Sequence, residues 1–184
     1  MSSFKLLKSE ILMQGRAFTF RRDTLATPDN RKTKFEIIEH IGSVVILPVD
    51  KDGNLLFVRQ YRHAASIDLL ELPAGTLEDA GEKPEECAAR EIREETGMAA
   101  RKLTKIGEFY LAPGYSTEFM HVFLATDLYY APLEADADEF LSVEAIPAAE
   151  AIRMAERSEI PDAKSLAALL LGRSYLEGKL DQQA

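Results

Sequence analysis

Short apolar runs separated by turn residues fill much of the chain, a pattern typical of β-strands. Residues 43–49 are almost continuously apolar, as expected of a strand buried on both faces, and residues 55–61 follow after the turn DKDGN. We expect these two runs to pair as a hairpin. Further strands are expected at 6–13, 18–25, 34–40, 103–111, 120–128 and 142–146.

Three segments have the pattern of helices. Pro84 is expected to open the first, because its missing N–H costs nothing in the first turn, and Gly97 is expected to end it. The others cover residues 148–158 and 164–180, and the leucines of the last have mostly helical spacing, which predicts core packing. The sequence therefore predicts an α+β fold with a mixed β-sheet.

The N-terminal strands are too short to form a core alone. We expect residues 1–40 to be an antiparallel β-subdomain that packs against something else, and residues 41–184 to be the main domain.

The composition argues against several classes of function. The 184 residues carry a net charge of −9 without a cluster of lysine and arginine, which argues against nucleic-acid binding. No stretch resembles a signal peptide or a membrane span, so we expect a cytoplasmic protein without membrane contact. The single cysteine, Cys87, excludes an internal disulfide and is expected to be buried.

The first expected helix is unusually acidic. Glu91, Glu94 and Glu95 share one helix face, where three carboxylates repel one another unless a cation neutralises them. Carboxylate oxygens are ligands that Mg2+ and Mn2+ prefer. The spacing therefore predicts a divalent-metal site, although glutamate-rich helices are also commonly plain solvated surface.

Residues 75–98, GTLEDAGEKPEECAAREIREETGM, resemble the Nudix box. Its usual form is Gly, five residues, Glu, seven residues, then Arg-Glu-apolar-x-Glu-Glu-x-Gly-apolar, and every position from Glu82 to Met98 matches. The loop between Gly75 and Glu82 is one residue longer than the pattern, and we expect the turn-prone residues 79–81 to absorb this insertion. The resemblance implies the Nudix fold, an α/β/α sandwich.

Outside the box the chain is similar to the ADP-ribose pyrophosphatase branch of that family. The similarity lies in LLFVRQYRHAA, LLELPAG, APGYSTEFMHVFLA and DADEFLSV, and in Pro113, the fifteenth residue after Met98, where the branch tends to have a proline. Pro113-Gly114 is also an ordinary turn dipeptide. The resemblance implies metal-dependent hydrolysis of ADP-ribose to AMP and ribose 5-phosphate, by a homodimer that exchanges its N-terminal strands.

The resemblance also implies roles for residues of the box. Glu91 and Glu95 would be the principal ligands of Mg2+, with Mn2+ as a possible substitute, and the backbone carbonyl of Ala74 would complete the site. Glu94 would serve a second ion or act through water, and Arg90 would orient a neighbouring carboxylate.

The general base is expected outside the box, on the acidic segment before the last strand. By resemblance it is Glu139, with Asp138 as the alternative, although such loops are commonly solvated surface. Two roles remain open for Glu82: a contact with the metal or its ligands, or a structural role near the helix N-terminus.

Substrate contacts are expected from two places. Arg59 and Arg62 follow a strand and are candidates for binding phosphates, although exposed arginines at strand ends are common. Ser116 and Glu118, in the loop opened by Pro113, are candidates for the ribose hydroxyls, with turn capping as the alternative.

Two other functions fit part of this pattern. One is hydrolysis of another nucleoside diphosphate sugar, such as GDP-mannose, because the same box serves those substrates. The other is a non-catalytic ADP-ribose sensor that regulates transcription. The intact carboxylate set and the lack of a basic DNA-binding domain argue against the sensor.

Overall fold

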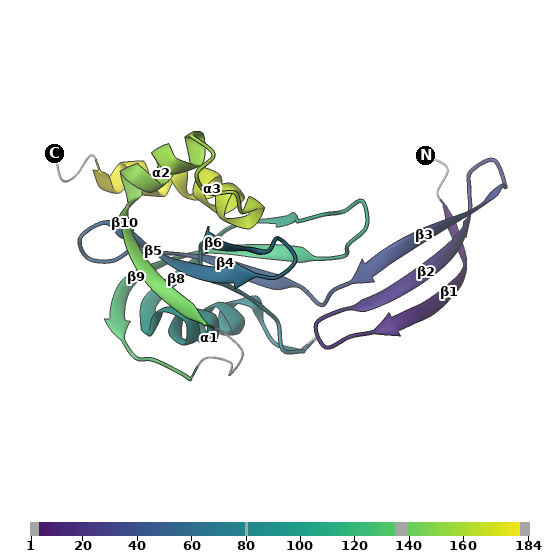
Figure 1. Cartoon of the computed structure of the whole chain (residues 1–184), viewed down its shortest axis with the longest axis horizontal. Helices are drawn as coiled ribbons and strands as arrows, with labels where there is room; N and C mark the ends of the chain where they lie inside the picture. Colours follow the sequence, from purple (N-terminus) through teal and green to yellow (C-terminus); the bar gives the residue numbers. More distant parts are fainter. Residues whose placement is uncertain (1–3, 80, 135–139, 181–184) are drawn as a thin grey trace. The chain divides into compact units, whose positions relative to one another are not determined.

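The computed structural model describes residues 4–79, 81–134 and 140–180. Contacts divide the chain into two units: unit 1 is Met1–Gly42 with Tyr110–Phe119, and unit 2 is Ser43–Phe109 with Met120–Ala184. The elements are β1 (Lys5–Gln14), β2 (Thr19–Ala26), β3 (Lys32–Glu39), β4 (Ser43–Pro48), β5 (Asn54–Arg62), β6 (Ile67–Glu71), β7 (Ala74–Thr76), α1 (Pro84–Thr96), β8 (Met98–Tyr110), β9 (Phe119–Tyr130), β10 (Leu141–Pro147), α2 (Ala148–Glu156) and α3 (Ala163–Leu180) (Figure 1).

Unit 2 is an α/β/α sandwich. One sheet has the strand order β7-β4-β9-β8, in which β4 runs parallel to β9 and antiparallel to β7, and a second sheet has the order β10-β5-β6. Helix α1 lies on one side of the strands, and α2 and α3 lie on the other (Figure 1). The expected α+β fold with a mixed sheet is confirmed.

Strand β4 supplies both layers of the core. Its side chains alternate, so Val44 and Ile46 pack on the side of α1, whereas Val45 and Leu47 pack on the side of α2 and α3. All four are fully buried, and each contributes roughly 1.5–3 kcal/mol of hydrophobic stabilisation. The core holds β4, and with it the neighbouring strand β7, in a fixed position next to α1.

The helices begin and end close to the predicted positions. Pro84 occupies the first turn of α1, and Gly97 ends the helix with a left-handed φ of 72°, its N–H donating to the carbonyl of Arg93 at 3.1 Å. Helix α2 ends at Glu156, two residues before the predicted Ser158, and α3 begins at Ala163, one residue early. Among the described residues, no helix is both long enough and apolar enough to span a membrane.

The predicted hairpin of residues 43–49 and 55–61 is wrong. After a single bridge between Val49 and Leu55 the two strands separate into different sheets, where β4 pairs with β7 and β9, and β5 with β6 and β10. A continuous apolar run buried on both faces is typical of a strand in a parallel pair, and β4 pairs in parallel with β9. The short strands β6 and β7 were not predicted, and β8 begins at Met98, earlier than the predicted residue 103.

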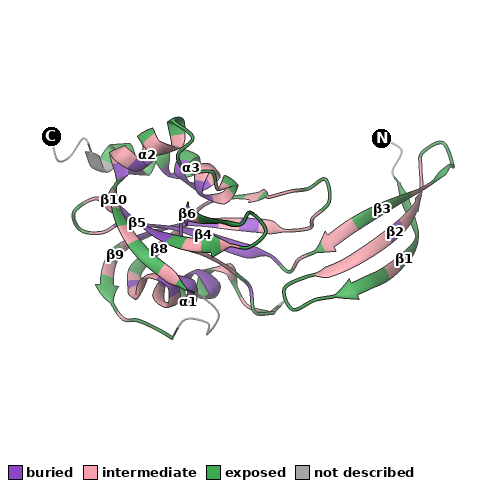
Figure 2. Cartoon of the chain, in the orientation of Figure 1, coloured by how far each residue is buried: buried purple, intermediate pink, exposed green. Residues whose placement is uncertain are grey.

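Unit 1 contains the antiparallel sheet β1-β2-β3. The segment 110–119 joins this unit through β3, since Ile38 donates its N–H to the carbonyl of Tyr115 at 2.8 Å and accepts from the N–H of Thr117 at 3.0 Å. Within the three strands the only buried residue is Asp23, so the sheet has no apolar core of its own (Figure 2).

Candidate active site

Helix α1 carries two carboxylates into the interior of unit 2. Glu91 is 8% exposed and Glu95 is 5% exposed. The Glu95 carboxylate accepts a hydrogen bond of 3.0 Å from the backbone N–H of Ala74 on β7. Burying carboxylates is costly unless hydrogen bonds or cations compensate them. This helix face is therefore not a plain solvated surface.

Gly75 makes room for the Glu91 carboxylate. A Cβ atom at position 75 would lie 1.9 Å from the Cδ and Oε1 atoms of Glu91 and 2.4 Å from Oε2, far inside van der Waals contact. Only glycine leaves this space. The first glycine of the motif therefore lets the carboxylate lie directly against the backbone of β7.

Arg90 holds several carboxylates at once. Its Nη1 atom donates to Glu91 at 2.7 Å and to Glu94 at 2.9 Å, and its Nε atom donates to Glu82 at 3.2 Å. Burial works against the charged guanidinium, but the hydrogen bond to Glu82 and the charge of Glu91 outweigh it, so the pKa of Arg90 is raised above its ordinary value. Arg90 therefore contacts Glu82, Glu91 and Glu94 at once, and a contact with neighbouring carboxylates is what the sequence predicts for it.

Side-chain hydrogen bonds hold the loop before α1. The Asp79 side chain accepts from the N–H groups of Gly81 at 2.6 Å and Glu82 at 3.0 Å, which forms a turn at the expected position. The Glu82 side chain accepts from the N–H of Glu78 at 2.7 Å as well as from Arg90. Glu82 therefore connects the loop to the helix, which supports the structural reading of this residue.

The donor set fits a hard divalent cation. We use the term "carboxylate face" for Glu91, Glu94 and Glu95 together with the backbone of Ala74 and Gly75. Its side-chain donors are all carboxylate oxygens, the ligand type of Mg2+ and Mn2+, and Gly75 lets the Glu91 carboxylate lie against the backbone of β7. Within residues 4–79, 81–134 and 140–180, no three acidic, histidine or cysteine side chains converge as a ready metal cluster. Arg90 and the N–H of Ala74 contact the carboxylates of this face instead.

A second charged cluster surrounds Glu71 at the end of β6. Glu71 is 1% exposed and accepts two hydrogen bonds from Arg62, at 2.8 and 2.7 Å, and one from Lys164 on α3. Burial alone would raise the pKa of Glu71, but the hydrogen bond from Arg62 and the charge of Lys164 outweigh burial and lower it. The charge of Glu95 also helps to raise the pKa of Arg62, after the larger effect of Glu71.

The other predicted substrate residues lie on different elements. Arg59 forms an exposed ion pair of 2.6 Å with Glu144 on β10. Pro113, Ser116 and Glu118 belong to unit 1, where the Ser116 hydroxyl accepts from the N–H of Glu118 at 3.1 Å, the expected turn-capping contact. Arg59 and Arg62 belong to unit 2.

The predicted general base, Glu139, and its alternative, Asp138, lie outside the described residues. Sequence reasoning missed Glu71, Lys164 and Ser165. A signal for Glu71 is present, because an isolated glutamate in the apolar run LLELP needs a buried partner. Nothing in the sequence identifies that partner.

Cys87 is buried, as predicted. Its thiol lies 3.6 Å from the carbonyl of Thr76, to which it donates a weak hydrogen bond. Burial raises the pKa of the Cys87 thiol to about 12, so the reactive thiolate is negligible at neutral pH.

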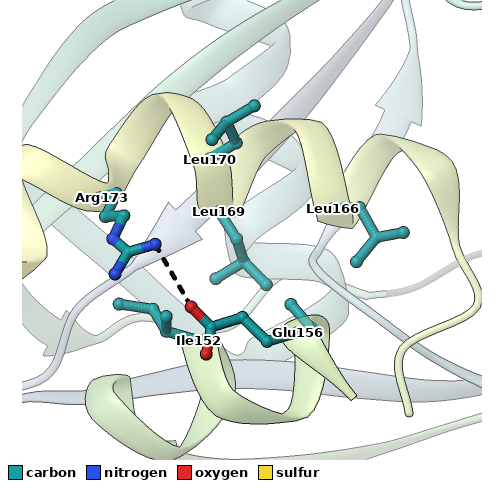
Figure 3. A pocket seen from close by; sticks show the side chains of 7 residues that line it. Ile152, Glu156, Leu166, Leu169, Leu170 and Arg173 are labelled. Carbon is teal, nitrogen blue, oxygen red and sulfur yellow. Dashed lines mark hydrogen bonds and ion pairs between the residues drawn. The ribbon is translucent and has the colours of Figure 1, made fainter. Parts of the chain in front are cut away.

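A pocket of about 170 Å³ lies between α2 and α3 (Figure 3). Its lining is mainly apolar, including Ile152, Leu166 and Leu169, and its one carboxylate, Glu156, pairs with Arg173 at 3.3 Å. A pyrophosphate group needs cations or a bound metal, so this pocket does not match that chemistry. The carboxylate face is the better candidate.

Comparisons with known proteins show the family to which the chain belongs. The NUDIX domain family matches residues 39–169. The chain is 37% identical over 182 residues to an ADP-ribose pyrophosphatase of Bacillus subtilis, covering 98% of this chain and 96% of that protein. It is 38% identical over 177 residues to an ADP-ribose pyrophosphatase of Mycobacterium tuberculosis, covering 95% and 86%.

The fold is similar to a solved structure described as an ADP compounds hydrolase, with a TM-score of 0.83, 29% identity, and coverage of 96% of this chain and 95% of that one. The chain belongs to the NUDIX family and is a hydrolase of that family.

Proposed function

We propose that the protein hydrolyses the pyrophosphate bond of ADP-ribose, releasing AMP and ribose 5-phosphate. The observation that carries the proposal is the carboxylate face, where Glu91 and Glu95 are buried against the β7 backbone in a matching box. The similarity along nearly the whole chain to two ADP-ribose pyrophosphatases supports the substrate.

Glu91 and Glu95 are proposed as the principal ligands of Mg2+, with Mn2+ as a substitute, alongside Glu94 and the carbonyl of Ala74. When bound, the ion neutralises charge on the pyrophosphate and activates water for in-line attack. Arg90 keeps Glu91 and Glu94 in place, and its raised pKa means that it stays charged at every working pH.

Glu139 is proposed as the general base, with Asp138 as the alternative. The test is Glu139→Gln beside Asp138→Asn. If the assignment is right, only the first variant lowers turnover, by about 10²- to 10⁴-fold, and Mn2+ binding stays unchanged in both. Near-normal turnover of Glu139→Gln would move the role to Asp138 or into the box.

Arg62 is the stronger of the two proposed phosphate contacts. Its guanidinium is held by the buried Glu71, and the charge of Glu95 helps to raise its pKa, whereas Arg59 pairs with the exposed Glu144. Ser116 and Glu118, with Pro113 shaping their loop, are proposed to bind the ribose hydroxyls.

We further propose that residues 1–40 exchange between the subunits of a homodimer. In support, β1 exposes apolar side chains that its own sheet does not cover, among them Leu6 (53% exposed), Ile11 (67%) and Met13 (53%). Sedimentation of the wild type as a monomer would contradict this assignment. We also propose a cytoplasmic location, which fits a chain with a single cysteine and therefore no internal disulfide.

The substrate is tested by comparing kcat/KM for ADP-ribose, GDP-mannose, ADP-glucose, NADH and diadenosine polyphosphates in Mg2+. We expect the highest value for ADP-ribose. A higher kcat/KM for GDP-mannose would support the same type of reaction with GDP-mannose, rather than ADP-ribose, as the substrate. Tight binding of ADP-ribose without cleavage of any compound would favour the sensor.

A further inference from the structure

The start of α3 forms a connected set of polar contacts with the end of β6. The "α3 anchor" is Asp162, Lys164 and Ser165. The Ser165 hydroxyl, in a residue with no exposed surface, donates to the Asp162 carboxylate at 2.5 Å and accepts from the backbone N–H of Leu72 at 2.7 Å. Lys164 pairs with Asp162 at 3.0 Å and also with Glu71.

These contacts fix two consecutive residues of one short segment. Lys164 holds the side chain of Glu71, and Ser165 holds the backbone of Leu72. Both Glu71 and Leu72 are buried, at 1% and 0% exposure, so water does not replace a contact that is lost. The contacts with the α3 anchor therefore fix the position and direction of the backbone where it continues from Leu72 toward Gly75.

The same segment reaches the carboxylate face within three residues. Pro73 accepts from the N–H of Ile46 at 2.8 Å, Ala74 donates to Glu95 at 3.0 Å, and Gly75 lies against Glu91. A shift at Leu72 would therefore move the backbone atoms that contact the two buried carboxylates.

We propose that the α3 anchor positions residues 71–75 and thereby sets the metal affinity of the carboxylate face. This inference rests on the proposed function, because it requires that the carboxylate face binds a divalent ion. The three anchor residues act through the backbone of Ala74 and Gly75, so they are positioning residues. Partners that hold metal ligands in place typically change affinity by 10- to 100-fold when removed.

The test measures Mn2+ binding by calorimetry and electron paramagnetic resonance in the full-length protein. Ser165→Ala is expected to raise the dissociation constant about 10-fold, with kcat returning to within about twofold of wild type at saturating Mn2+. Asp162→Asn, which keeps the side-chain shape, is a second variant and should shift the constant in the same direction.

The matched control is Leu176→Ala, in the same helix. Leu176 is 2% exposed and belongs to the core, so this variant destabilises α3 without removing an anchor contact. It should lower the melting temperature and leave the Mn2+ dissociation constant unchanged.

Two results would overturn this inference and leave the proposed function standing. One is wild-type Mn2+ affinity in Ser165→Ala, and the other is an equal loss of Mn2+ affinity in Ser165→Ala and Leu176→Ala. A wild type that binds no Mn2+, or a Glu95→Gln variant that binds it equally well, would overturn the proposed function as well.

Discussion

Replacing Gly75 by alanine should disable the enzyme while leaving its fold intact. The added methyl group would lie 1.9 Å from the Glu91 carboxylate, whereas carbon contacts need about 3.5 Å, so the carboxylate must move by roughly 1.6 Å. Metal sites tolerate only about 0.2 Å in ligand distance, and a misplacement of about 1 Å can cost about 10²-fold in rate. We expect kcat/KM to fall by at least about 10²-fold.

The cost in stability should be small. The colliding atoms form the end of a flexible side chain, and alanine also lowers the entropy of the unfolded chain, which is worth about 0.4–1 kcal/mol. The melting temperature should therefore stay within about 3 °C of the wild type. The control is Gly178→Ala on α3, where a Cβ atom meets nothing within 4 Å, and it should retain full activity.

The assay combines kcat/KM over a range of Mg2+ concentrations with thermal unfolding by circular dichroism. Activity of Gly75→Ala within twofold of the wild type would refute the reasoning about Glu91. Loss of both folding and activity would show that Gly75 serves the fold rather than the carboxylate.

Three further predictions follow from the charged and buried groups. Arg90→Lys should lower kcat/KM by about 10- to 100-fold, because one ammonium cannot replace the guanidinium contacts to several carboxylates; unchanged kinetics would contradict the orienting role. Because the pKa of Glu71 is lowered in the folded state, its ionised form adds stability above the ordinary pKa of 4.5, and this stability is lost as pH falls through the folded-state pKa. The free energy of unfolding in urea should therefore depend less on acid pH in Glu71→Gln than in the wild type. At pH 7 that variant should lose about 3–5 kcal/mol, and a loss below 1 kcal/mol would argue against the buried ion cluster. Cys87, with its pKa raised to about 12, should react with a thiol reagent only after unfolding, and rapid labelling of the native protein would contradict its burial.

The box was readable from sequence because its chemistry is local. Carboxylates at i, i+3 and i+4, a proline at the start of the helix and a glycine at its end all act within a few turns, and the structure has the helix from Pro84 to Thr96 as expected. The hydrogen bonds of Asp79 also lie in the loop where the sequence predicts a turn, which is a local feature.

Strand pairs and ion pairs between residues far apart in the chain could not be predicted from the sequence in this way. Ser43 pairs with Met120, and Glu71 pairs with Lys164 from 93 residues further along the chain. The short DKDGN turn favoured a local hairpin, but β4 is buried on both faces and pairs in parallel with β9, as is typical of continuously apolar strands. Likewise, a lone glutamate in an apolar strand indicates a buried partner without identifying it.

The central claim is metal-dependent cleavage of ADP-ribose at the carboxylate face. The most direct test follows ADP-ribose by phosphorus NMR with Mg2+, after chelation, and with the Glu95→Gln variant. The account predicts AMP and ribose 5-phosphate as the products, no turnover after chelation, and a loss of about 10²-fold or more in the variant. Unchanged cleavage after chelation or in Glu95→Gln would contradict it.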